Sequence, residues 1–233
     1  MNKYTIKINI ILIALVFFNI PIIHAEEDDV DYTDWAIEDL LQVRIVTSVG
    51  KKEQSLANAP AAIYVVTSKD IRRSGVTTIP DALRMVPGLQ VAKTNAHTWA
   101  ISSRGFNGFF ANKLLVLIDG RSVYTPEFSG VWWDTVDTVL DDIDRIEVIR
   151  GPGSTLWGAN AVNGVINIIT KNAKETQGGL ISVAAGNEEK NMTNLRYGGM
   201  LDEATETYFR VYTKLLKRDG FANSTADDQW HST

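Results

Sequence analysis

The most restrictive feature of the sequence is an alternation of apolar and polar side chains in three successive stretches near its C-terminal end. Short polar segments at 186–190 and 202–203 separate these stretches. The pattern predicts three long antiparallel strands with one apolar and one polar side. Two architectures fit it: a membrane β-barrel, whose outer side faces lipid, and a soluble sandwich, whose apolar side faces a second sheet. The apolar side comprises Ile181, Val183, Ala185, Leu195, Tyr197, Leu201, Phe209, Val211 and Leu215, and the polar side carries Asn194, Arg196, Glu206, Arg210 and Lys214.

The N-terminus indicates export. Lys3 and Lys7 precede an apolar run over 8–20 that only two Asn residues interrupt, and Ala25 supplies a small residue at a cleavage point. This order is typical of a signal peptide over 1–25, and the run is shorter than the roughly 20 residues that a membrane-spanning helix needs. Export favours the barrel over the sandwich.

Composition excludes several classes of protein. The 233 residues contain no Cys, which removes disulfide scaffolds, thiolate metal sites and thiol catalysis. Eight acids lie between 26 and 39, where no Lys or Arg occurs, and this block is typical of a solvated, mobile arm. The remainder of the mature chain is nearly neutral, so no nucleic-acid partner is expected.

Residues 53–172 predict a small α+β domain, a mixed sheet with short helices. Helical segments are expected at 68–73, before Gly75, and after Thr78, which with Asp81 resembles a capping box. The strands are expected at 61–67, 89–92, 99–103, 114–118, 144–150 and 164–170, and Asp119 with Gly120 indicates a hairpin turn.

Catalytic and metal-binding patterns are weak. His97 and His231 are the only histidines after the signal peptide, and no nucleophile, His and acid set accompanies them. We therefore expect no enzyme activity, no cofactor and no metal site. Aromatic residues are more informative, because many of them lie in the loop-like runs 106–112 and 124–133, where they serve either the core or ligand contact.

Three runs in this domain carry a resemblance to a known family. IPDALRMVPGLQV, RGFNGFFANKLLVLIDGRSVYTP and IEVIRGPGSTLWGANAVNGVINIITK resemble the plug domain of TonB-dependent outer-membrane receptors and follow that family's order. The resemblance covers about 53–172, and residues 173–233 resemble the first strands of the family's barrel. The plug motif glycines are Gly105, Gly120, Gly151, Gly153, Gly158 and Gly164.

The resemblance implies a barrel of about 22 strands that the plug closes. It also implies binding of a scarce nutrient, such as a ferric siderophore, haem or cobalamin, and its release to the periplasm when TonB and its inner-membrane complex pull on the N-terminal arm. Outer-membrane lipid is then a further partner. The arm, 26–52, contains a β-prone segment that is our candidate TonB box, because an extended segment can add to a partner's sheet edge. The box comprises Val43, Arg44, Ile45, Val46 and Thr47.

The resemblance further assigns roles to plug residues. Arg104 and Arg150 resemble plug arginines that pair with acids on the barrel wall. Loops at the apex of the plug meet ligand in this family, which makes Asn95, His97, Trp99, Tyr124, Phe128, Trp132 and Trp133 the expected contacts.

Length adds a constraint to this expectation. The residues after 173 suffice for three or four strands, whereas closed membrane barrels have at least about 8. We therefore expect a partial receptor that ends within the barrel near His231 and could not transport alone. The alternative is a soluble periplasmic module, in which the plug binds a ligand or a partner without a barrel.

Overall fold

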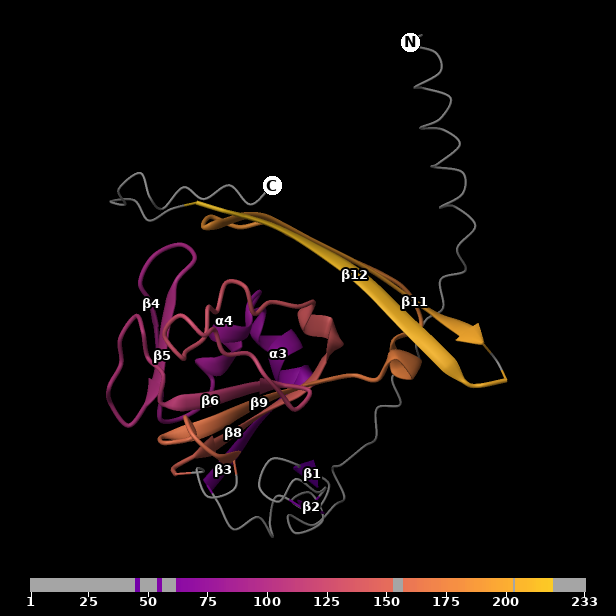
Figure 1. Ribbon diagram of the computed structural model, residues 1–233. Coiled ribbons are helices and arrows are strands. Elements are labelled where there is room, and N and C mark those ends of the chain that lie inside the picture. Colours follow the sequence, from indigo (N-terminus) through magenta and orange to yellow (C-terminus); the bar gives the residue numbers. More distant parts are fainter. Residues whose placement is uncertain (1–44, 47–53, 56–61, 153–156, 203, 220–233) are drawn as a thin grey trace, which may run out of the picture. The chain divides into compact units, whose positions relative to one another are not determined.

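The computed structural model describes residues 45–46, 54–55, 62–152, 157–202 and 204–219, all within one compact unit, Trp35–Thr233 (Figure 1). The described part of the chain contains a five-stranded sheet, two two-stranded sheets and a three-stranded sheet. The predicted signal peptide and acidic arm over 1–44 lie outside the described residues.

A five-stranded mixed sheet forms the centre of the domain, with the order β3-β8-β9-β6-β7. Strands β6 and β9 run parallel, and the other neighbours are antiparallel. This mixed sheet with few helices confirms the predicted α+β class. The strands are β3 (Ala62–Thr67), β6 (Leu114–Ile118), β7 (Arg121–Ser122), β8 (Ile143–Arg150) and β9 (Gly164–Thr170). A separate hairpin pairs β4 (Leu89–Lys93) with β5 (Trp99–Ser103).

Short helices follow the first strand, as predicted. Helix α3 (Ser68–Ser74) is capped by Thr67, whose hydroxyl accepts the Asp70 N–H, so the cap lies one residue before the Ser68 that the sequence indicated. Helix α4 (Ile79–Leu83) has the predicted Thr78 cap, and Thr78 also donates to the Asp81 carboxylate at 2.6 Å. Two 3-10 turns, η2 (Leu140–Asp142) and η3 (Ala173–Thr176), flank the later strands.

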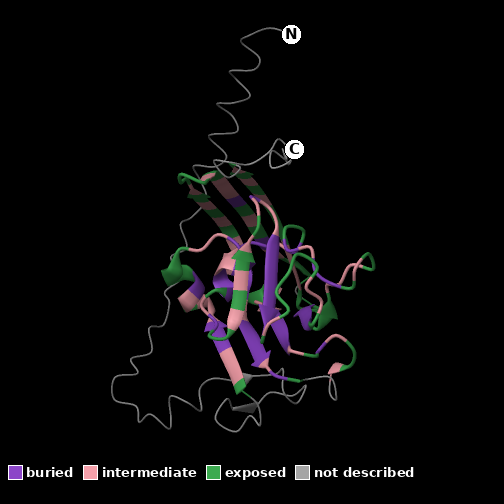
Figure 2. Cartoon of the chain, turned by 90° about the vertical axis from the view of Figure 1, so that its left-hand side faces the viewer, coloured by how far each residue is buried: buried purple, intermediate pink, exposed green. Residues whose placement is uncertain are grey.

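The central sheet is buried on both faces, which explains why the parallel pair β6 and β9 is nearly continuously apolar. Ile146, Val148 and Ile166 belong to the larger core cluster, which includes Leu83 of α4. The alternate residues of the same strands form a second cluster, and Figure 2 shows the buried strands in purple. This second cluster comprises Leu115, Leu117, Ile149, Ala161 and Val165.

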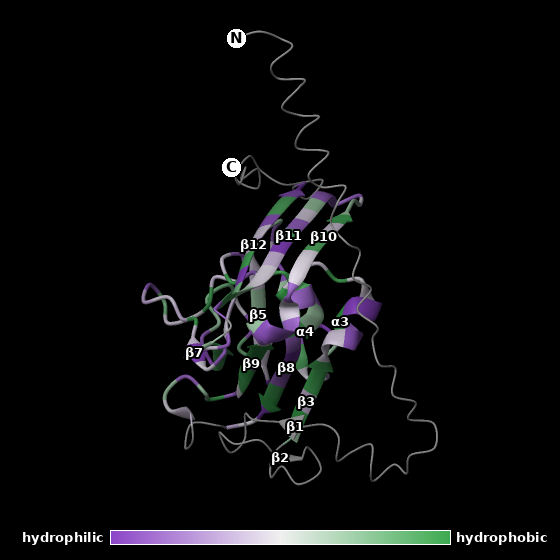
Figure 3. Ribbon diagram, turned by 90° about the vertical axis from the view of Figure 1, so that its right-hand side faces the viewer, coloured by the Kyte–Doolittle hydropathy of each residue, from purple (hydrophilic) through white to green (hydrophobic). Residues whose placement is uncertain are grey.

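Three antiparallel strands follow the central sheet, in the order β10-β11-β12. They are β10 (Gly178–Ala184), β11 (Glu189–Asp202) and β12 (Thr207–Arg218), and Figure 3 shows their alternating hydropathy. The predicted apolar side is exposed: Ile181 and Val183 are 68% and 70% exposed. Three details differ from prediction: β10 ends at Ala184, before Ala185, β11 already begins at Glu189, and Glu206 lies in the β11–β12 turn rather than on the polar side of a strand. No helix in the described ranges is long and apolar enough to cross a membrane.

Candidate functional site

Four aromatic rings from two loops form one cluster on the domain. Phe109 and Phe110 come from the loop before β6, and Phe128 and Trp132 come from the loop after β7. Five of the six ring pairs have centroids 4.6–6.4 Å apart, and these five meet edge to face. Phe109 and Phe110 are 40% and 59% exposed. An apolar platform of this kind, carried by loops on a rigid sheet, is suited to ligand contact.

Backbone and polar contacts hold this platform in place. The Trp132 indole donates to the Glu127 carboxylate at 2.8 Å, and the Asn112 amide donates to the Phe128 carbonyl at 3.3 Å. Gly130 makes the ring positions possible, because a Cβ there would lie 2.0 Å from the Phe128 ring. Phe128 and Trp132 were predicted contacts, whereas Phe109, Phe110 and Gly130 were missed. The aromatic run 106–112 was the available signal for the two phenylalanines.

The tip of the β4–β5 hairpin carries two further predicted contacts. The Asn95 side-chain oxygen accepts the N–H groups of His97 and Thr98, which closes a tight turn. Asn95 and His97 are partly exposed. The tip therefore remains a candidate for ligand contact.

The two predicted tryptophan contacts at 99 and 133 lie in the core. Trp99 is 4% exposed and Trp133 is 8% exposed, and both belong to the larger core cluster. Arg84 and Lys93 each place a cation about 5.5 Å from the Trp99 ring centroid. Core packing accounts for the burial of both residues, and a role in ligand contact stays a prediction for them.

Tyr124 is a structural neighbour of the platform. Its hydroxyl donates to the Leu114 carbonyl at 2.6 Å, and burial raises the pKa of Tyr124 to about 12. The hydrogen bond ties the loop after β7 to the first residue of β6. A role in ligand contact stays a prediction for Tyr124.

The two plug arginines predicted to pair with barrel acids make their described contacts within the domain. Arg150 donates to the Pro87 carbonyl at 3.1 Å. Arg104 is exposed, and its guanidinium lies over Gly151, where a Cβ would be 3.4 Å from it. Pairing with the barrel wall stays a prediction for both.

The predicted motif glycines occupy turns and close approaches. Gly120 (φ 78°) follows Asp119 (φ 48°) in the predicted β6–β7 turn, a pair of left-handed residues that suits a tight hairpin. Gly164 lies so close to β8 that a Cβ would be 2.4 Å from the Ile149 carbonyl oxygen. Gly105, Gly151 and Gly158 also have positive φ, and Gly153 lies outside the described residues.

The candidate TonB box is described in part. Ile45 and Val46 form β1 (Ile45–Val46), which pairs antiparallel with β2 (Gln54–Ser55). Val43, Arg44 and Thr47 lie outside the described residues. The extended backbone of β1 agrees with the β-prone pattern, and TonB binding by this segment stays a prediction.

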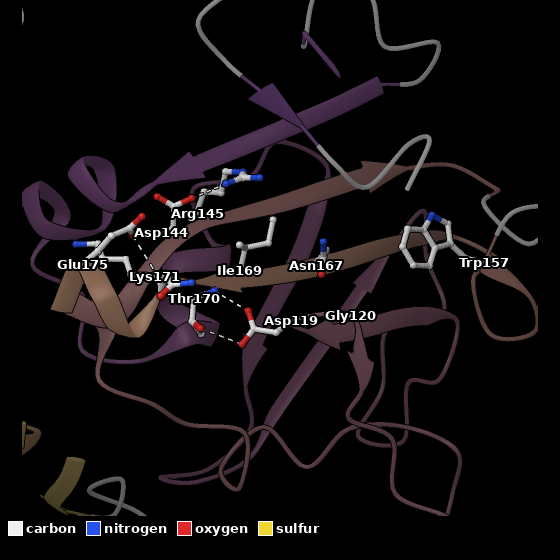
Figure 4. A pocket seen from close by; sticks show the side chains of 11 residues that line it. Asp119, Gly120, Asp144, Arg145, Trp157, Asn167, Ile169, Thr170, Lys171 and Glu175 are labelled. Atoms are coloured by element: carbon white, nitrogen blue, oxygen red, sulfur yellow. Dashed lines mark hydrogen bonds and ion pairs between the residues drawn. The ribbon is translucent and has the colours of Figure 1, made fainter. Parts of the chain in front are cut away.

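A pocket of about 680 Å³ opens beside the ends of β6 and β9 (Figure 4). Several of its charged groups have partners: Asp119 accepts from the Thr170 N–H at 2.8 Å and from its hydroxyl at 2.9 Å. Arg145 contacts Asp144 and donates to the buried Glu147 at 2.8 Å. Burial alone lowers the pKa of Arg145, but Glu147 and Asp144 outweigh it and raise that pKa. These pairings are typical of a structural network.

Within the described residues, no group of three or more His, Cys, Asp or Glu side chains could hold a metal ion.

Comparison with known proteins identifies the class. Residues 55–165 match the family described as TonB-dependent Receptor Plug Domain. The mixed sheet agrees with this match, and residues 55–165 form a plug domain of the TonB-dependent receptor family. The three-stranded sheet resembles the start of that family's barrel.

Particular relatives narrow the comparison. The chain is 31% identical over 152 residues to the vitamin B12 transporter BtuB of Vibrio vulnificus, covering 64% of this chain and 24% of that protein. It is 33% identical over 195 residues to the iron-regulated outer membrane virulence protein of Vibrio cholerae, covering 76% of this chain and 28% of that protein. The structure of FpvA from Pseudomonas aeruginosa bound to a heterologous pyoverdine aligns with this chain with a TM-score of 0.61 and 22% sequence identity. The alignment covers 75% of this chain and 22% of that one, and it shows that the two share a fold. The chain thus spans about a quarter of the length of the curated relatives it matches.

Proposed function

We propose that this chain is the plug and first barrel strands of an outer-membrane receptor that takes up a scarce nutrient, with energy supplied through TonB. The supporting observation is a plug domain followed directly by strands whose apolar side is exposed. Ile181, Val183, Val211 and Leu215 are 59–70% exposed on this side. In a barrel this side faces lipid, whereas a soluble module would have to leave it in water.

The ligand of this receptor is proposed to be an iron chelate, haem or cobalamin. The relative named for vitamin B12 transport supports cobalamin, and the relative named for iron regulation supports an iron source. Phe109, Phe110, Phe128 and Trp132 offer the ligand an apolar platform, and Asn95 and His97 at the β4–β5 tip add polar groups. Such a surface binds and orients a ligand without chemical change, in agreement with relatives that are named as transporters and receptors rather than enzymes.

Growth of a strain that lacks the receptor, complemented by the intact gene, tests uptake. Each medium supplies one iron or cobalamin source, and each is repeated in a strain that lacks TonB. We expect growth on one source only when both the gene and TonB are present. Growth that is equal without TonB would contradict the proposal.

Cell fractionation separates the receptor from the alternative soluble module. We expect the protein in the outer-membrane fraction. Its recovery in the soluble periplasmic fraction would instead favour a module made of the plug alone.

The TonB box is proposed to be the segment Val43 to Thr47. A synthetic peptide with this sequence should bind the C-terminal domain of TonB by adding a strand to it. A peptide with the same composition in scrambled order is the control. If the native peptide shows no binding at millimolar concentration, the box lies elsewhere.

A further inference from the structure

Four long cationic side chains line the polar side of the β11–β12 hairpin. Arg210, Lys214 and Arg218 recur every four residues along β12, and Arg196 of β11 lies opposite Tyr212. We call these four cations the cation row, and it extends over about 27 Å at roughly 3.4 Å per strand residue. Their side chains are only 7–16% exposed. Lys and Arg are rarely buried to this extent unless they are paired.

The first part of the cation row contacts Asp142, which is fully buried at the end of η2. Arg196 donates to one carboxylate oxygen, and the Nε of Arg210 lies 3.6 Å from the other. Arg210 also donates to the Lys171 carbonyl at 2.9 Å. Two guanidinium groups on the strands thus share one carboxylate of the plug, directly before β8.

Lys214 joins two further plug segments. Its ammonium lies 2.9 Å from the Thr77 carbonyl, 2.8 Å from the Asp137 carboxylate and 3.4 Å from the Thr138 carbonyl. An ammonium has three donors, so these three acceptors satisfy it completely.

Arg218 reaches the tip of the β4–β5 hairpin, where it donates to the Ala96 carbonyl at 3.1 Å. It also pairs with Glu189 of its own sheet. Lys93, at the end of β4, adds a contact of 3.2 Å to Glu188 in the β10–β11 turn. The same sheet that holds the centre of the plug therefore also holds the tip that carries Asn95 and His97.

A cavity of about 200 Å³ lies between α3 and the strands β10 and β11, and it reaches the cation row at Thr77, whose carbonyl accepts from Lys214. Thr77, Ser182 and Asn194 are among its lining residues. Asn194 is 3% exposed, and its side-chain oxygen has no hydrogen-bond partner among the described residues. A cavity of this size has room for ordered waters, at about 30 Å³ each, and the Asn194 side-chain oxygen offers one of them an acceptor. Water in this cavity is therefore able to replace the Thr77 carbonyl as an acceptor for Lys214.

We propose that the cation row is an electrostatic latch that holds the plug against the β11–β12 hairpin and opens when the plug moves. This inference rests on the proposed receptor function. Its polarity is the reverse of the pairs predicted for Arg104 and Arg150, because here the strands supply the cations and the plug supplies the acceptors. Removing one partner from a buried pair leaves an uncompensated charge, so the latch depends on the plug acids as well as on the cations.

The absence of Cys from the sequence provides a direct assay. Ser182→Cys places one thiol beside the cavity. The full receptor is produced with this substitution in the outer membrane of cells that lack TonB. Any Cys outside these 233 residues is replaced by Ser, so that only this thiol can react. The rate of labelling by a maleimide reports how often the plug separates from the strands. Lys214→Met should label about tenfold faster or more, because a buried pair loses its cation. Lys217→Met is the matched control, since Lys217 is exposed on the opposite side of the same strand, and it should label like the parent.

Two more variants separate charge from packing. Asp142→Asn keeps the shape of the side chain but removes its charge, and it should also label faster, whereas Lys214→Arg keeps the cation and should label slowly. The inference is overturned if Lys214→Met labels no faster than Lys217→Met, or if Asp142→Asn labels like the parent. If Lys214→Met does not reach the outer membrane, the Asp142→Asn rate decides. Because the assay needs neither ligand nor TonB, its failure is distinct from failure of the growth test for uptake.

Discussion

Single residues decide whether the plug loops can form their aromatic platform. Gly130 is the tightest case, because its missing side chain leaves room for the Phe128 ring and for the Ala111 carbonyl, 3.0 Å from the Cβ position. Ala111 lies in a different loop, so the sequence around residue 130 does not show this second contact.

We expect Gly130→Ala to displace the Phe128 ring and therefore to weaken ligand binding. Because the site would be overpacked, the substitution should also lower the free energy of unfolding by about 1–3 kcal/mol. Gly108→Ala is the matched control, because a Cβ there meets nothing within 4 Å. Ligand affinity and the urea midpoint of the detergent-solubilised receptor measure the two effects. Equal affinities for the two variants would show that the platform does not bind the ligand.

Tyr124 makes a prediction about alkaline pH. Its pKa is about 12 in the folded protein against roughly 10 when unfolded, so the folded state holds the phenolic proton more tightly. This stabilisation is complete below pH 10 and is lost as the pH rises through 12. Tyr124→Phe should lower stability at neutral pH, because the bond to Leu114 is lost, but it should flatten the decline between pH 10 and 12. Urea midpoints across that range measure the slope, and parallel slopes for parent and variant would contradict the assignment.

At the scale of secondary-structure elements, local sequence patterns predict where several strands begin and end and where one helix begins. The β6 and β9 ranges and the Thr78 cap of α4 follow their sequence signals, because alternation, caps and turn residues act within a few positions. Close approaches between elements do not follow such signals. Gly198 of β11 crosses η3 so closely that a Cβ would lie 2.1 Å from the Thr176 carbonyl oxygen.

We expect Gly198→Ala to push β11 away from η3 and to destabilise the receptor by about 1–3 kcal/mol, as other overpacked sites do. Gly179→Ala, on the neighbouring strand β10, is the control, because its Cβ meets nothing within 4 Å. Thermal unfolding in detergent measures the stability of both variants. A Gly198→Ala variant as stable as the Gly179→Ala variant would show that the crossing is loose.

At the scale of the whole molecule, the two sides of the three-stranded sheet face different surroundings. The polar side contacts the plug through buried cations, and the apolar side is exposed. Burial on one side and exposure of apolar residues on the other agree with a wall between a polar lumen and lipid.

Val211→Lys therefore tests the lipid-facing assignment. A lysine that faces lipid should cost up to about 2–4 kcal/mol, the value at the bilayer midplane, and should reduce the amount of receptor in the outer membrane. Val211→Leu, which remains apolar at the same position, should assemble like the parent. Quantitative immunoblots of membrane fractions give the comparison, and normal assembly of the lysine variant would place this side in water.

The sequence by itself determined the class of fold, the β6 and β9 ranges, the Thr78 cap and the resemblance to the plug domain, because each depends on spacing or motifs within short segments. Only the tertiary structure decided that Trp99 and Trp133 are core residues, that Phe109 and Phe110 join the aromatic platform, and that strand cations hold the plug. The Lys214 ammonium and the Thr77 carbonyl are 137 residues apart in the chain. No local pattern encodes such a pair, since its partners meet only when the sheet and the hairpin have folded against each other.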